Sequence, residues 1–78
     1  MCTLNELKTG QKGIVYSLNG GEQFVSRITA MGFTPQTPLV IVSGRNRGPL
    51  IVYLRDTAVA LGRGEAAKIT VLVTEGAI

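Results

Sequence analysis

The chain has 78 residues, enough for one domain with a small hydrophobic core. It contains no histidine and one cysteine, so the usual catalytic bases, thiol nucleophile pairs and zinc-ligand sets are missing. The net charge of +3 is too small to identify a nucleic-acid-binding protein. We therefore expect no enzyme activity, no cofactor and no metal site.

Features of the first residues predict a cytoplasmic protein. Cys2 has no partner for a disulfide within the chain, which favours a reducing compartment, and we expect it to lie unused near a fraying terminus. Polar residues interrupt the stretch where a secretory signal would need an apolar core. No apolar run approaches the roughly 20 residues that cross a bilayer, so we expect no insertion into the membrane.

The N-terminal third predicts a cap and a first strand. Thr3 and Glu6 have the spacing of a capping box, and Leu4 and Leu7 could then seal one end of a barrel. Residues Ile14–Leu18 alternate like a half-buried strand.

One convincing helix follows this strand. Phe24, Ile28 and Met31 recur at the spacing of one helical face. If Met31 is the C-cap, Gly32 falls at the position that needs a left-handed conformation, and Phe33 at the next position can contact Ile28.

The remaining apolar segments are too short for ordinary helices and are rich in Val and Ile, which predicts strands. The expected strands are Pro38–Ser43, Leu50–Leu54, Thr57–Leu61 and Ile69–Val73. Arg45 and Arg47 should lie at the tip of a hairpin loop between the first two of these.

Two polar corners separate the last three strands. Arg55 and Asp56 form a tight turn, in which Asp56 is expected to bond its own backbone. Gly62 and Gly64 can adopt positive φ, and they should precede a single helical turn over residues 65–68 that begins with Glu65. Arg63, between the two glycines, should be exposed.

This order predicts a mainly β single domain over residues 1–78: an SH3-like, partly open barrel of five strands. One α-helix follows the first strand and plugs an end of the barrel, and a short helical turn precedes the last strand. An OB-fold is the nearest competitor, although it usually carries its helix between the third and fourth strands.

Charged residues on the surface suggest contacts with a partner and no catalysis. The five carboxylates are scattered, so a paired-carboxylate site is not indicated. Arg45 and Arg47 could form a basic rim together with Lys8, Lys12 and Arg63. A solvated surface is the favoured interpretation of this rim, and a protein contact is the next. Few aromatic residues are free to stack on bases, so nucleic acid ranks below a protein partner.

Three segments resemble FeoA, the small ferrous iron transport protein A that accompanies the membrane transporter FeoB in bacteria. They are LNELKTGQKGIV (4–15), RITAMGFTPQTPLVIV (27–42) and GPLIVYLRDTAVALGRGEAAKITV (48–71). The most specific combination is Met31-Gly32-Phe33 with the LGRGEAA stretch over residues 61–67. Where similar chains tend to have Pro-Gly-Thr after the helix, this chain has Pro35-Gln36-Thr37, so we expect type I geometry that spares Gln36 a positive φ.

The resemblance implies an SH3-like barrel, a cytoplasmic location and a partner role towards FeoB, whose cytosolic part carries a GTPase domain. It also implies similarity to the C-terminal domain of metal-dependent repressors of the diphtheria-toxin-repressor type. An accessory role in ferrous iron uptake is therefore the leading hypothesis. A regulatory domain of the repressor type and a nucleic-acid-binding barrel are the alternatives.

We expect the partner to contact the helix face opposite Phe24 and Ile28, together with the groove beside residues 62–65. The candidate partner-binding residues are Gln23, Arg27, Arg45, Arg47, Arg63 and Glu65. Self-association is expected to be weak at most.

Overall fold

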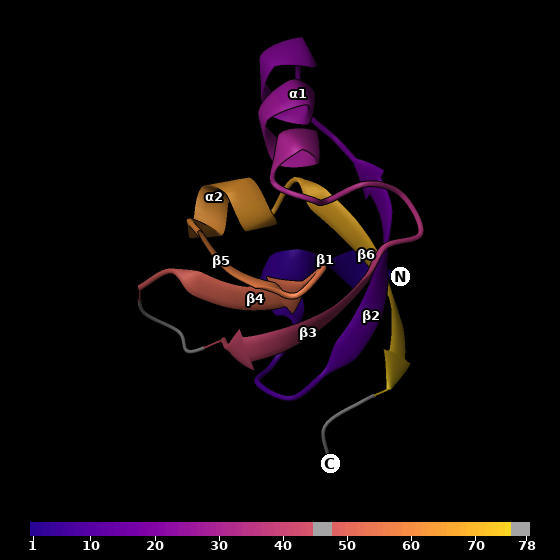
Figure 1. Cartoon of the computed structure of the whole chain (residues 1–78), viewed down its shortest axis with the longest axis vertical. Coiled ribbons are helices and arrows are strands. Elements are labelled where there is room, and N and C mark those ends of the chain that lie inside the picture. Colours follow the sequence, from indigo (N-terminus) through magenta and orange to yellow (C-terminus); the bar gives the residue numbers. More distant parts are fainter. Residues whose placement is uncertain (45–47, 76–78) are drawn as a thin grey trace.

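A computed structural model describes residues 1–44 and 48–75 of the chain. Six strands form one antiparallel sheet in the order β1-β6-β2-β3-β4-β5, which curls into a small barrel-like body without closing (Figure 1). The strands are β1 (Cys2–Thr3), β2 (Lys12–Leu18), β3 (Pro38–Ser43), β4 (Leu50–Leu54), β5 (Thr57–Leu61) and β6 (Ile69–Glu75). The helices are the 3₁₀ turn η1 (Leu4–Glu6), α1 (Glu22–Ala30) and α2 (Arg63–Ala66).

The mainly β fold and the positions of five strands were predicted correctly, whereas a sixth strand, β1, was missed. In β1, Cys2 lies opposite Val71 and Thr3 opposite Thr70 of β6. Cys2 is therefore part of the sheet and packs against the core, which corrects the expectation of a fraying end. A strand of two residues is too short to show the alternation by which strands are recognised.

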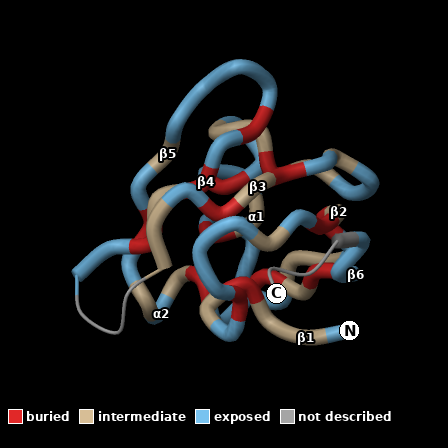
Figure 2. Tube along the Cα trace, turned by 90° about the horizontal axis from the view of Figure 1, so that it is seen from below, coloured by how far each residue is buried: buried red, intermediate tan, exposed pale blue. Residues whose placement is uncertain are grey.

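The core lies inside the curled sheet and is made by alternate residues of the strands (Figure 2). Its largest fully buried side chains are Phe33, Leu4, Ile28, Ile41, Leu50, Leu54, Leu61, Ile69, Val15, Val52 and Val71. Leu4 and Leu7 are buried at one end, as predicted. The capping box at Thr3 and Glu6 is also confirmed, because the Thr3 N–H donates to Oε2 of Glu6 at 2.7 Å.

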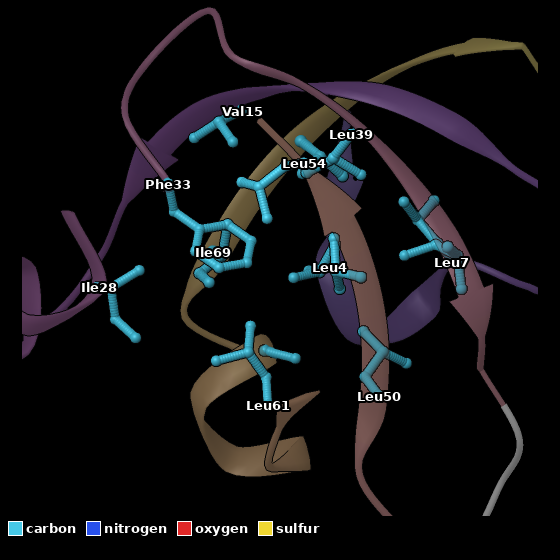
Figure 3. Packing of buried hydrophobic residues seen from close by; sticks show 14 of the residues in the cluster. Leu4, Leu7, Val15, Ile28, Phe33, Leu39, Leu50, Leu54, Leu61 and Ile69 are labelled. Atoms are coloured by element: carbon cyan, nitrogen blue, oxygen red, sulfur yellow. The ribbon is translucent and has the colours of Figure 1, made fainter. Parts of the chain in front are cut away.

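The end of α1 directs its last turn onto this core, as predicted. Met31 is the C-cap and Gly32 has φ 109°, and the N–H of Phe33 donates to the carbonyl of Ile28 at 3.2 Å. These are the bonds of a Schellman motif. The Phe33 ring consequently points inward, near Ile28, Leu54 and Ile69 (Figure 3).

The corner after α1 differs from the prediction. Gln36 has φ 73°, and the N–H of Thr37 donates to the carbonyl of Thr34 at 3.1 Å, so this is a turn of type II character with Pro35 at its second position. Bonds to β2 maintain the conformation, because the N–H of Gln36 donates to the carbonyl of Val15 at 2.7 Å. The expected type I geometry was therefore wrong.

The positive φ angles that we predicted for Gly62 and Gly64 lie instead at the other polar corner, Arg55 and Asp56. Arg55 and Asp56 have φ of 51° and 61°, as a two-residue hairpin turn of type I′ requires. Gly62, in contrast, has φ −69° and is the N-cap of α2, which begins two residues earlier than expected. Arg55 and Asp56 adopt the left-handed conformation although they are not glycines, because the two-residue β4–β5 hairpin requires it.

Within residues 1–44 and 48–75, no helix combines the length and the apolar character needed to cross a membrane.

Candidate interaction site

A cleft of about 360 Å³ opens between α1 and the segment that joins α2 to β6. Gln23, Phe24 and Arg27 of α1 line it on one side, and Lys68 lines it on the other. We call these four residues, together with Glu65 of α2, the α1–α2 cleft.

The side of the cleft that α1 provides combines two polar side chains with one ring. Gln23 and Arg27 are four residues apart, so they lie one above the other on the same exposed face of the helix. Phe24 is 92% buried beside them, since only 8% of it is exposed. A Cβ at position 20 would come within 2.4 Å of the Phe24 ring, so Gly20 leaves the space that the ring occupies.

Lys68 is held in place by bonds to the end of β2. The N–H of Asn19 donates to the carbonyl of Lys68 at 2.7 Å, and the Asn19 side-chain amide donates to Oγ1 of Thr70 at 2.7 Å. The Lys68 ammonium then lies 5.3 Å from the centre of the Phe24 ring, within the range of a cation–π contact.

Glu65 connects the two helices through its two carboxylate oxygens. Oε1 accepts a bond from the N–H of Gly62 at 3.2 Å and so caps α2, in which Glu65 is the third residue and not the first as we had predicted. Oε2 lies 2.8 Å from Nη2 of Arg27, and this ion pair joins α2 to α1. Because the Arg27 side chain is 59% exposed, we expect the pair to orient the two side chains more than it stabilises the fold.

The structure brings together three of the six candidate partner-binding residues. Gln23 and Arg27 line the cleft, and Glu65 is bonded to Arg27. Arg45 and Arg47 lie outside the described residues. Gln23 and Arg27 are exposed on α1, but they border Phe24 and do not lie on the face opposite to it, where we had expected the contact.

Arg63 differs most from its prediction. It is half-buried where we expected it exposed, and its Nε and Nη2 atoms are buried with no hydrogen-bond partner in the described part of the chain. Burial arises because Arg63 begins α2 itself and is not part of a glycine loop projecting into solvent.

Sequence reasoning missed Phe24 and Lys68 as members of the site. Phe24 was assigned to the core by its helical spacing, and it is indeed buried, yet the ring also forms the floor of the cleft. Lys68 reaches the cleft only through tertiary packing, which no spacing along the chain reveals.

Two groups with shifted pKa values lie away from the cleft, near the N-terminus. Hydrogen bonds from the backbone and hydroxyl of Thr3 hold the pKa of Glu6 below its ordinary value of 4.5. Burial, and next the Glu6 charge, raises the pKa of the Cys2 thiol. The Cys2 side chain is therefore mainly in the unreactive thiol form at neutral pH.

The α1–α2 cleft has the chemistry of a docking surface. The cations of Arg27 and Lys68 and the amide of Gln23 lie around the Phe24 ring. The Glu65 carboxylate pairs with Arg27, and the structure shows no bond between Glu65 and Lys68. The two cations can accept a carboxylate from a partner by charge-assisted hydrogen bonds. Across the described ranges, no three His, Cys, Asp or Glu side chains gather as metal ligands would.

Comparison with known proteins identifies the family. A family model described as the FeoA domain matches residues 2–73. The chain belongs to the FeoA family. It is 33% identical over 66 residues to the "Putative Fe(2+) transport protein A" of Campylobacter jejuni, an alignment that covers 85% of this chain and 89% of that protein.

Solved structures of FeoA proteins share the fold. An iron uptake regulatory protein, FeoA, superposes with a TM-score of 0.88 at 29% identity, over 92% of this chain and 96% of that one. The zinc complex of Stenotrophomonas maltophilia FeoA, described as a procaryotic SH3 domain protein, gives 0.79 at 25% identity, over 91% and 89% of the two chains. The predicted SH3-like architecture is thereby confirmed.

The predicted likeness to repressors is seen at the level of the fold. A manganese-dependent transcriptional repressor gives a TM-score of 0.81 at 22% identity, and the match covers 92% of this chain but 40% of the repressor chain. The shared part is therefore one domain of a longer protein.

Proposed function

We propose that this chain is a cytoplasmic accessory protein of ferrous iron uptake that acts by docking onto the cytosolic, GTPase-bearing part of a FeoB-type transporter. Membership of the FeoA family supports the connection with Fe²⁺ transport. The observation that carries the docking role is the α1–α2 cleft, where Arg27 and Lys68 flank an aromatic floor.

The cleft supports docking because two of its groups, the Lys68 backbone and the Arg27 guanidinium, are positioned before a partner arrives. Asn19 holds the backbone of Lys68, and Glu65 holds the guanidinium of Arg27. Side chains that are already ordered lose less conformational entropy on binding. We expect acidic side chains of the partner to contact Lys68 and Arg27, and an apolar one to contact the Phe24 ring.

Co-purification with the cytosolic part of the transporter, with and without guanine nucleotide, tests the proposal. Lys68→Glu should weaken binding about tenfold or more, because it places a carboxylate where we expect the partner to carry one. Lys8→Glu is the matched control: it makes the same charge change in the exposed loop between η1 and β2, at the far end of the molecule from α1 (Figure 1).

Two results would contradict the proposal at different levels. If the unaltered chain is not retained by the transporter fragment in any nucleotide state, the partner is wrong. If Lys8→Glu and Lys68→Glu weaken binding equally, the partner stands but the α1–α2 cleft is not the contact. The repressor-type regulatory alternative has only the shared fold in its support, and no particular observation favours it.

A further inference from the structure

The open edge of the sheet at β5 is a second feature that the α1–α2 cleft does not use. The strand order ends with β1 at one edge and β5 at the other. β1 has two residues, whereas β5 has five, Thr57–Leu61, and pairs only with β4 among the described strands. Thr57, Ala58 and Ala60 are exposed, and β5 is largely pale blue at the periphery of the molecule in Figure 2.

The hairpin turn determines which backbone groups face this edge. Leu54 and Thr57 flank a two-residue turn, so they form a hydrogen-bonded pair, and bonded and non-bonded pairs alternate from there. Ala58 opposite Tyr53 and Ala60 opposite Ile51 are then the non-bonded pairs. The N–H and C=O groups of Ala58 and Ala60 therefore point away from β4, towards the open edge.

The sequence of β5 has none of the features that usually prevent another strand from pairing with the free N–H and C=O groups of an edge strand. Edge strands are usually blunted by charged side chains, proline, a bulge or extreme shortness. β5 reads TAVAL and continues its pairing with β4 in unbroken register. No backbone hydrogen bond from another described segment reaches residues 57–61.

We propose that β5 binds an extended segment of another protein as an added antiparallel strand. The backbone groups of Ala58 and Ala60 would supply four hydrogen bonds, the donors and acceptors of two residues. The two methyl side chains leave a low floor beside Ile51 and the 43%-exposed Tyr53. Large apolar side chains at alternate positions of the added strand would cover that floor.

A peptide fits this edge better than a second copy of the chain does. Self-pairing about a two-fold axis at Val59 joins two strands of five residues, which is far less contact than the roughly 800 Å² per partner of a stable dimer. A flexible segment can extend beyond the edge onto Ile51 and Tyr53. The inference is independent of the proposed function, because β5 shares no residue with the α1–α2 cleft.

Hydrogen exchange and peptide selection test the proposal. In the free protein, the amides of Ala58 and Ala60 should exchange much faster than those of Val59 and Leu61. Peptides of about twelve residues, selected from a random library on the whole chain, should alternate apolar residues and slow exchange at Ala58 and Ala60.

Variants of β5 separate backbone pairing from side-chain contact. Ala60→Pro removes an N–H that β4 does not use, so the fold should persist while peptide affinity falls about tenfold or more. Ala60→Ser keeps the N–H and is the matched control, with affinity near that of the unaltered chain. Circular dichroism checks that both variants are folded.

The proposal is overturned if Ala58 and Ala60 are already protected in the free protein, or if no peptide is selected. It also fails if Ala60→Pro binds the selected peptides as well as Ala60→Ser does. A concentration-dependent dimer that Ala60→Pro abolishes would assign the edge to a second copy and would equally overturn it. None of these outcomes depends on whether the transporter fragment binds at the cleft.

Discussion

Gln36 holds a left-handed backbone conformation that glycine adopts without strain. Its φ is 73°. The bonds from the N–H of Gln36 to Val15 and from the N–H of Thr37 to Thr34 hold the turn in this conformation. Gln36→Gly should raise the free energy of unfolding by about 0.5–1 kcal/mol, since relief of the left-handed strain exceeds the entropy cost of glycine.

Gln23→Gly is the matched control for this prediction. Gln23 is the second residue of α1, and glycine costs up to about 1 kcal/mol within a helix, so the same substitution should be destabilising there. Urea unfolding of both variants gives the comparison. Equal losses at the two positions would mean that Gln36 carries no strain.

Glu6 should make the free energy of unfolding depend on pH in the acidic range. Because bonds from Thr3 lower the pKa of Glu6 in the folded state, the stabilisation is fully present above its ordinary value of 4.5 and is lost as the pH falls through the lower, folded-state pKa. In Glu6→Gln the carboxylate is absent, so the difference in stability between the two proteins should be largest at neutral pH and should shrink below pH 4.5. Urea unfolding across this range measures it, and a constant difference would contradict it.

At the level of elements, β2 and β6 approach more closely than a side chain allows. A Cβ on Gly13 would lie 2.9 Å from the carbonyl oxygen of Leu72, near an irregularity in the pairing of the two strands. Gly13→Ala should therefore cost about 1–3 kcal/mol, because the backbone of β6 must move.

Gly64→Ala provides the opposite case for the same substitution. Gly64 lies within α2, its φ is not positive, and a Cβ there meets nothing within 4 Å. The variant should gain about 0.5–1 kcal/mol from the reduced freedom of the unfolded chain. Thermal unfolding of the two variants should thus shift in opposite directions, and a shared direction would show that close packing at Gly13 is not the cause.

The elements were predictable where a short-range pattern determines them. Strands β3, β4 and β5 have the predicted bounds because apolar runs end at Pro, Gly or a polar turn. The end of α1 was predictable because only glycine suits the position after Met31.

The rest of the fold and most of the site depend on contacts between distant segments. Gln36 acquires its conformation from Val15, and Lys68 reaches Phe24 because Asn19 holds its backbone. The ion pair of Arg27 with Glu65 joins two helices whose packing the sequence does not display. Sequence reasoning therefore named Gln23, Arg27 and Glu65 as candidate partner-binding residues without showing that they meet.

At the level of the whole molecule, the small core makes the fold sensitive to one residue. Phe33 is fully buried where the end of α1 meets the inside of the sheet (Figure 3). Phe33→Ala should cost about 3–5 kcal/mol. That equals the roughly 3–5 kcal/mol that a single core of this size supplies, so the variant should be unfolded at 25 °C.

Phe33→Leu keeps most of the apolar volume and should remain folded with lower stability. Dispersion of amide signals in a two-dimensional NMR spectrum distinguishes the two states. A well-dispersed spectrum for Phe33→Ala would mean that the core is larger or more adaptable than its buried residues indicate.

The place of β6 in the sheet sets the moment at which a newly made chain can fold. β6 lies between β1 and β2, so the first two strands to be synthesised have no common neighbour until the last one is made. While β6 is still inside the ribosome, β2, β3, β4 and β5 can pair with one another, but β1 has no neighbour in the sheet and β2 lacks one of its two. Folding of this domain is therefore completed only after residues 69–75 have emerged, and until then one edge of β2 stays without its partner strand.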